Sequence, residues 1–536
     1  MLTLGYGIVC LAACAATAAT GDWPQWGGQD CRNMVADAHG LPATFVPGEK
    51  RADGSGIDMA TTKNVRWIAK LGSQTYGNTT VANGRVFVGT NDDYVDDPRY
   101  TSTRGGLLKC FAEATGKLLW QLEIPRLEIK KENFNFDNID LGICSSPTVD
   151  GDRVYLVSNR CEVLSVDVHG MANGNDGPFR DEAQYTAGVG KKPVAIKPTD
   201  GDIVWRYDMI RELPVWPQDA ACCSILVHGD LLYVCTANGV DKSHDHVPYP
   251  LAPSLIVLEK HTGRLVAQDD EKIGTRLFHG QWSNPSLGRV NGKDLVFYGG
   301  GDGICYAFEA LDKVPQKLTM LKKVWSFDCN PPHYHVQNGK PVHYRDGDIR
   351  RHKPIDKGDG SFFGPSEIIA TPVFYKNRVY IATGQDPSHG RGHGMLACID
   401  ATKTGEITQS GKVWMFDKID RSLSTVSIAD GLLYVAETFG KLYCLDPETG
   451  KTYWVHDTKS EIWGSTLVAD GKVYLGTKKG LWVFQAGRTK KVLGEIRLGS
   501  PVYCTPIVAN GTLFVATHKY LWAVRAPEAR VASGER

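Results

Sequence analysis

The sequence predicts an all-β protein, an eight-bladed β-propeller whose ring is closed by an N-terminal strand. Two observations carry this prediction. A pattern of four short strands recurs eight times, and its last three copies start about 40 residues apart, at Ser424, Gly464 and Cys504. The last copy lacks a fourth strand, whereas the strand-like segment "NVRWIAKL" (64–71) precedes the first copy without a unit of its own. A unit of this size cannot bury both faces of its sheet alone, so the units are expected to stack around a ring.

The first element of the chain is an apolar leader. Residues 1–21 are rich in alanine and other small or apolar residues, and polarity rises abruptly after them. This pattern is typical of a secretory signal peptide and is short for a membrane span. We therefore expect an exported protein, periplasmic, associated with the cell envelope or secreted, with no integral membrane span. The stretch "LAAC" also has the form of a lipoprotein box, which would place a lipid anchor on Cys14.

The next segment, 22–63, begins with "DWPQWGG" and carries two tryptophans, Trp23 and Trp26. Chain ends usually fray, so this much apolar surface indicates an end that is tied into the fold. We expect the segment to pack on the ring. Immediately after it, the strand that carries Trp67 is expected to complete blade eight and so to join the two ends of the propeller.

The propeller is predicted to span 64–526, with a C-terminal tail at 527–536. Each unit consists of an apolar strand, commonly an Asp-Gly or Asn-Gly turn, a second apolar strand, a third strand such as "LYCLD", a turn, and a fourth strand that often carries tryptophan. The units begin near eight residues: Gly77, Ser145, Cys222, Ser283, Ala370, Ser424, Gly464 and Cys504.

Charge and cysteine spacing exclude some kinds of function. Lys and Arg together number 60, as do Asp and Glu, so the formal net charge is zero. The sequence has no basic stripe for nucleic acid and no cationic face for a membrane surface, and we expect no nucleic-acid partner. The cysteines after the leader show no spacing typical of a zinc site.

The long loops indicate which face of the propeller works, because function resides most often in loops on a rigid scaffold. In a four-stranded antiparallel blade, the turn between strands two and three and the connection to the next blade emerge on the same face. Such loops are long in blades one, three, four and five and short in blades six to eight, which predicts a funnel walled on one side. Its lining is expected to draw on eight residues: Asn238, Asp241, His244, His279, Trp282, Gln385, Asp386 and His389.

These side chains combine an aromatic surface, hydrogen-bonding groups and imidazoles that titrate near neutral pH. The combination suits a polar ligand such as a sugar. The His-x-His pairs "HDH" (244–246) and "HYH" (333–335) could also ligate a transition metal, although polar decoration of a loop is the plainer interpretation. The sequence assigns neither a catalytic residue nor a metal ligand.

Several repeat motifs resemble a known family. "TGKLLW" and "ETGKTYW", the "LYCLD" strand ahead of the latter, and the opening "DWPQW" are similar to the pyrroloquinoline-quinone (PQQ) propeller repeat. The family includes quinoprotein alcohol dehydrogenases, which are eight-bladed and hold PQQ and calcium, and a non-catalytic lipoprotein that assists outer-membrane protein assembly. By resemblance to the dehydrogenases, Asn238 would ligate calcium and Cys222–Cys223 would form a disulfide over the quinone. The alternative for the two cysteines is a pair of buried strand residues.

The repeat specifies the fold more firmly than the activity. Our leading hypothesis is an exported binding or scaffold module that recognises envelope proteins or glycans through the loop-rich face. One alternative is a PQQ- and calcium-dependent alcohol or sugar dehydrogenase, a quinoprotein-type oxidoreductase. Another is a carbohydrate-active enzyme with a histidine-rich site.

Overall fold

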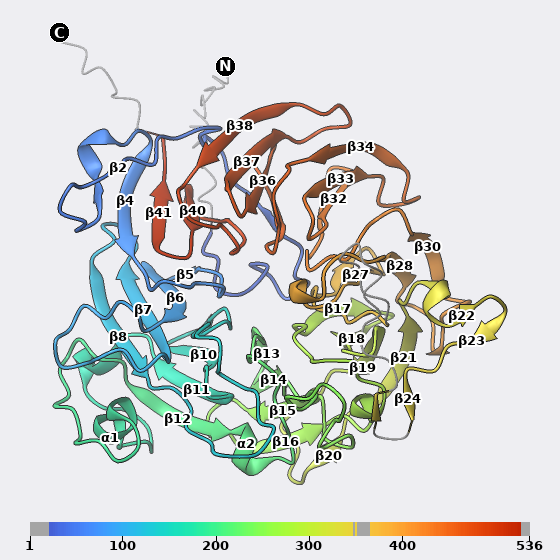
Figure 1. The fold of residues 1–536 in the computed structure, drawn as a ribbon, viewed down its shortest axis with the longest axis horizontal. Helices are drawn as coiled ribbons and strands as arrows, with labels where there is room; N and C mark the ends of the chain where they lie inside the picture. Colours follow the sequence, from blue (N-terminus) through green and yellow to red (C-terminus); the bar gives the residue numbers. More distant parts are fainter. Residues whose placement is uncertain (1–20, 347–348, 351–364, 527–536) are drawn as a thin grey trace, which may run out of the picture.

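The chain forms a ring of eight β-sheets around a central axis (Figure 1). The computed structural model describes residues 21–346, 349–350 and 365–526. The predicted eight-bladed propeller is confirmed. The leader with Cys14 and the tail at 527–536 lie outside the described residues. Within the described part of the chain, no helix is long and apolar enough to cross a membrane.

Each blade is an antiparallel sheet that runs outward from an inner strand beside the axis. Blades one to four contain, in sheet order, β5 Thr80–Ala82, β6 Arg85–Asn91, β7 Gly106–Ala112 and β8 Leu118–Ile124; β9 Thr148–Asp150, β10 Arg153–Val157, β11 Glu162–Asp167 and β12 Ile203–Asp208; β13 Leu226–His228, β14 Leu231–Cys235, β15 Leu255–Glu259 and β16 Leu265–Gln268; β17 Ser286–Val290, β18 Lys293–Gly299, β19 Ile304–Glu309 and β21 Lys323–Asp328. Blades five to eight contain β26 Val373–Tyr375, β27 Arg378–Ala382, β28 Leu396–Asp400 and β30 Lys412–Phe416; β31 Ser427–Ala429, β32 Leu432–Ala436, β33 Lys441–Leu445 and β34 Thr452–Asp457; β35 Thr466–Ala469, β36 Lys472–Thr477, β37 Gly480–Gln485 and β38 Val492–Arg497; β39 Ile507–Ala509, β40 Thr512–Ala516, β41 Tyr520–Val524 and β4 Val65–Lys70.

Small elements extend or decorate these sheets. Three short strands pair in parallel with blade edges: β1 Val35–Ala36 with β35, β20 Thr319–Met320 with β16, and β29 Gly405–Glu406 with β21. The remaining elements are three hairpins and several short helices: β2 Glu49–Lys50 with β3 Ile57–Asp58, β22 Val336–Gln337 with β23 Lys340–Pro341, β24 Arg345–Asp346 with β25 Ile349–Arg350, α1 Glu182–Ala187, α2 Met209–Glu212, η1 Met59–Thr61, η2 Gly170–Asn173, η3 Ile273–Thr275, η4 Pro332–Tyr334 and η5 Pro387–His389.

Strand β4 closes the ring, as the sequence predicts. It pairs antiparallel with β41, and Trp67 lies opposite Ala523. The Trp67 indole then reaches blade one, where its Nε1 donates to Glu113 O at 2.8 Å. Gly116 (φ +70°) packs against the Trp67 indole, and a Cβ at this position would lie 2.5 Å from the nearest indole atom. The first and last blades are therefore joined by a shared sheet and by a buried indole.

The same tryptophan contact joins most neighbouring blades. In six of the eight fourth strands, an indole Nε1 donates to a backbone carbonyl just after the third strand of the next blade, at 2.8 to 3.3 Å. The pairs are Trp67 with Glu113, Trp120 with Val168, Trp205 with Lys260, Trp325 with Ala401, Trp414 with Pro447 and Trp454 with Gly487.

Near the axis, a second set of contacts forms a closed circle, which we call the polar belt. It consists of one small polar residue from each blade: Asn78, Ser146, Ser224, Asn284, Thr371, Thr425, Ser465 and Thr505. The side-chain oxygen of each accepts a hydrogen bond from the belt residue of the preceding blade. The donor is a backbone N–H in seven cases and the side-chain amide of Asn284 in the eighth.

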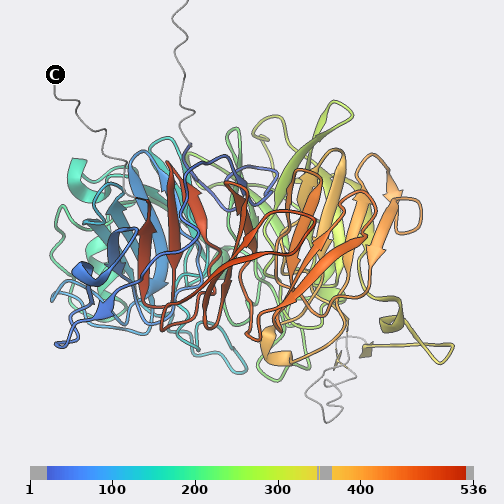
Figure 2. The same ribbon diagram turned by 90° about the horizontal axis from the view of Figure 1, so that it is seen from above.

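The N-terminal segment covers one end of the axis (Figures 1 and 2). Trp23 and Trp26 are both buried, and Trp26 Nε1 donates to the belt residue Thr371 at 2.9 Å. The segment meets the inner region of every blade through hydrogen bonds of Gly21 with blade eight, Trp23 with blade one, Pro24 with blade two, Arg32 with blades three and four, Asp30 with blade four, Cys31 with blade five, Asn33 with blade six and Met34 with blade seven.

Arg32 anchors this segment. The side chain is fully buried, and burial lowers its pKa to about 10. Its Nε donates to Pro285 O at 3.0 Å and its Nη2 to Ile225 O at 3.2 Å, while its Nη1 bonds to Trp26 O and Gln25 Oε1. One guanidinium thus satisfies carbonyls of two blades and of the segment itself.

We predict that Arg32→Met lowers the free energy of unfolding by about 3 kcal/mol, because it leaves buried carbonyls without donors. Urea denaturation followed by circular dichroism measures the change. The control is Arg51→Met, which removes an exposed arginine of the same segment and should change the value by less than about 0.5 kcal/mol. Equal midpoints for the two variants would contradict the anchoring role.

Candidate functional site

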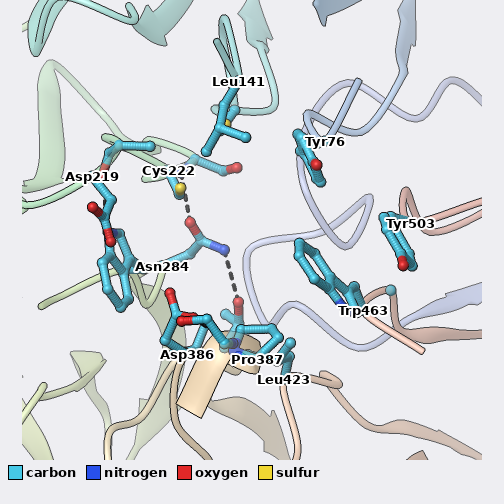
Figure 3. Close-up of a pocket in the computed structure, with 18 of the residues that line it drawn as sticks. Tyr76, Leu141, Asp219, Cys222, Asn284, Asp386, Pro387, Leu423, Trp463 and Tyr503 are labelled. Carbon is cyan, nitrogen blue, oxygen red and sulfur yellow. Dashed lines mark hydrogen bonds between the residues drawn. The ribbon is translucent and has the colours of Figure 1, made fainter. Parts of the chain in front are cut away.

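A cavity of about 1000 Å³ lies on the axis, and all eight blades contribute to its lining (Figure 3). Trp26 from the N-terminal segment is among the lining residues. The long loops project from the side opposite that segment (Figure 2). The cavity therefore has the N-terminal segment at one end and the loops at the other.

One wall of the cavity is aromatic. Trp463 and Tyr503 stack with ring centroids 4.4 Å apart and an interplanar angle of 9°, and Tyr76 stacks on Trp463 at 5.7 Å. Figure 3 shows these three rings together on one side of the cavity. The Tyr503 hydroxyl donates to Glu461 Oε2 at 2.9 Å, which places a carboxylate beside the stack. This wall comes from blades one, seven and eight.

The other wall carries ionisable groups, which we call the acid–histidine cluster: Asp219, His244, His279, Asp386 and His389. His244 Nε2 lies 3.1 Å from His279 Nε2, and the His279 and His389 ring centroids are 4.6 Å apart. His279 Nε2 also lies 3.9 Å from Asp219 Oδ2. Burial, together with the charge of Asp386, raises the pKa of Asp219 to about 6. The cluster can bind hydroxyl groups, exchange protons or hold a cation.

Three blades bring the cluster together through four loops. Asp219 precedes the inner strand of blade three, and His244 lies between β14 and β15 of the same blade. His279 precedes the inner strand of blade four, and Asp386 caps η5 in blade five by accepting from Ser388 N. All four loops are either connections into a blade or turns between its second and third strands, which are the two kinds of loop that the sequence predicts on one face.

Of the eight residues expected in the funnel, five line the cavity: His244, His279, Trp282, Asp386 and His389. Trp282 supports the cluster, because its ring packs edge-on against His279 and its Nε1 donates to Ala220 O at 2.8 Å. The eight predicted residues thus include some that line the cavity and some that lie behind the lining residues.

The other three, Asn238, Asp241 and Gln385, do not line the cavity. Asp241 is buried in its own turn and accepts from Ser243 N and Oγ. Gln385 is also buried; its Nε2 bonds to Pro365 O and its Oε1 lies 3.2 Å from His389 Nδ1. These polar side chains hold the loops in place, since buried polar groups are almost always satisfied by local partners.

The residues suggested for PQQ and calcium do not fit those groups. Asn238 is fully buried, with Oδ1 accepting from Trp216 N and Nδ2 donating to Tyr249 O, so its amide is used by backbone groups. Cys222 lines the cavity, but Cys223 does not; its Sγ accepts from Cys235 N inside the blade, and both cysteines are free thiols. The described residues thus provide neither the expected calcium ligand nor the disulfide.

The sequence prediction missed Asp219 and the whole aromatic wall. A signal was present, because the residue two positions before each belt residue lines the cavity. In blade order these residues are Tyr76, Cys144, Cys222, Trp282, Ile369, Leu423, Trp463 and Tyr503. Alignment of the eight repeats at this position would have identified the aromatic wall.

Several known proteins are similar to this chain at low sequence identity. No curated protein matches the chain. Among solved structures, BamB from Moraxella catarrhalis is 12% identical, with 87% of this chain and 98% of that chain covered and a TM-score of 0.49. Quinohemoprotein alcohol dehydrogenase from Comamonas testosteroni is 14% identical, with 96% and 83% covered and a TM-score of 0.43. A europium-containing methanol dehydrogenase is 13% identical, with 93% and 89% covered and a TM-score of 0.46.

A protein-family model also matches the chain. The family model described as outer membrane protein assembly factor BamB matches residues 60–321 and 392–490, which is more than half of the chain. The matched ranges include complete repeats from both halves of the ring. The chain therefore belongs to this family of PQQ-repeat β-propellers.

Proposed function

We propose that this protein is an exported binding module of the cell envelope that takes a carbohydrate ligand into its central cavity. The observation that carries the proposal is the pairing of the two walls. A flat stack of Trp463, Tyr503 and Tyr76 faces a wall of carboxylates and imidazoles across the cavity (Figure 3).

The two walls match the two kinds of surface on a sugar. The C–H face of a pyranose ring is apolar and can lie on an indole or phenol ring, whereas its hydroxyl groups need acceptors and donors. Asp219, Asp386 and the imidazoles supply those partners. A volume of about 1000 Å³ lies at the upper end of the range for ligand sites, so it accommodates an oligomer better than a single small metabolite.

The two ends of the cavity differ, and this difference supports entry of a ligand from one side. The N-terminal segment, with Trp26 in the lining, lies at one end, and the long loops of blades three to five surround the other. The expected signal peptide and the family, whose description refers to outer membrane protein assembly, support a location at the envelope. The quinoprotein alternative is weaker, because Asn238 and Cys223 do not face the cavity.

We predict that Trp463→Ala weakens binding of a soluble oligosaccharide on the order of tenfold, because one stacking surface is lost. Isothermal titration calorimetry with oligomers of glucose and of N-acetylglucosamine measures the affinity. The control is Trp482→Ala, which removes a half-buried tryptophan from the same blade outside the cavity lining and should leave the affinity unchanged.

Two results would contradict the proposal. One is the absence of binding for every oligomer to a wild-type protein whose circular dichroism shows that it is folded. The other is binding that Trp463→Ala and Trp482→Ala reduce equally.

A further inference from the structure

The acid–histidine cluster has the composition of a metal site. One ligand atom each from Asp219, His279 and Asp386 can be chosen so that all three lie within 4.8 Å of one another. His244 lies beside this group, with its Nε2 at 3.1 Å from His279 Nε2. One imidazole nitrogen and two carboxylates form a mixed donor set that suits divalent transition metals such as zinc.

The spacing fits ligands around one ion. Zinc bonds to histidine nitrogen and carboxylate oxygen are about 2.0–2.2 Å long, so two ligand atoms of one ion lie at most about 4.4 Å apart. The distance from His279 Nε2 to Asp219 Oδ2, 3.9 Å, falls within that limit. His279 Nε2 and Asp219 Oδ2 are therefore close enough to bind the same ion.

The surrounding contacts hold these side chains in place. Asp219 Oδ1 accepts from Asn135 Nδ2 at 2.7 Å, and it is the other oxygen, Oδ2, that is directed toward His279. Asp386 is fixed in the same way, because its Oδ1 accepts from Ser388 N at 2.7 Å.

A buried carboxylate lies behind the more deeply buried histidine. Glu367 Oε1 is 3.9 Å from His279 Nδ1, and both side chains are at most 2% exposed. A carboxylate on the far side of a ligating imidazole is the usual way in which proteins orient such a ligand and raise its basicity. His279 therefore has Asp219 beside its Nε2 and Glu367 beside its Nδ1.

We propose that Asp219, His279 and Asp386 bind one divalent transition-metal ion at the loop end of the cavity. Two carboxylates balance the charge of such an ion, and the three side chains line the cavity, so a fourth coordination position would face the ligand space. This site differs from the calcium site implied by the family resemblance in both its residues and its donor atoms. The proposal is independent of whether the cavity binds a sugar.

The test uses the full mature chain, stripped with EDTA, dialysed and titrated with Zn²⁺ by calorimetry. We expect one ion per chain, an increase in melting temperature on binding, and a loss of affinity on the order of 100-fold in Asp219→Asn and in Asp386→Asn. Both substitutions preserve side-chain size and the Oδ1 acceptor, so these variants should remain folded; circular dichroism of the metal-free proteins checks this.

The matched control is His261→Ala. His261 forms an exposed pair with Asp230 at 3.2 Å, and its removal should not alter zinc binding. Absorption of the Co²⁺-loaded protein provides a second readout, because the d–d bands report nitrogen and oxygen ligation and should change in Asp219→Asn. Zinc binding that is absent, or equally strong in wild type and in both aspartate variants, would overturn the proposal. A wild-type protein that binds zinc but no sugar would count against the proposed function alone.

Discussion

The structure depends on the hydrogen bond that passes from each blade to the next through the polar belt. Seven backbone amides and the Asn284 amide donate in turn to the side-chain oxygen of the following blade, and the eighth bond returns from Thr505 to Asn78. The amides at the entrance to an inner strand have no partner in their own sheet, so burial near the axis requires one from a neighbour. A serine, threonine or asparagine in each blade supplies it, and the circle fixes the radius of the ring.

That circle also determines where a ligand can bind. The belt residues lie in the cavity lining, and the residues two positions earlier form the cavity walls beside them. On the other side, the N-terminal segment bonds to the inner regions of the blades and brings Trp26 into contact with the belt through Thr371. The size of the ring and the aromatic wall thus follow from the repeated belt position, and the N-terminal segment covers one end of the cavity. The acid–histidine cluster, by contrast, comes from loops that differ from one repeat to the next.

The sequence predicted the parts of this molecule that recur. The repeats identified all eight blades. The strand with Trp67 identified how the ring closes, because the last repeat lacks a fourth strand and this extra strand can supply it. Loop length predicted which face carries the long loops, and five of the eight residues expected there line the cavity. The sequence could not show that the Asn238 amide is used by Trp216 N and Tyr249 O, because that depends on how two irregular loops meet. Nor could it show the path of the N-terminal segment, whose contacts reach a sequence separation as large as 488 residues.

The most direct test of this account is native-state hydrogen exchange, measured by mass spectrometry on peptides that contain the belt amides of Asn78, Ser146, Ser224, Thr371, Thr425, Ser465 and Thr505. If the belt is one closed circle, these amides should exchange only through a common opening of the ring, with the same free energy in all blades and the highest protection in the chain. Fast exchange of a belt amide in one blade, with its neighbours still protected, would contradict the claim that the circle holds the propeller together.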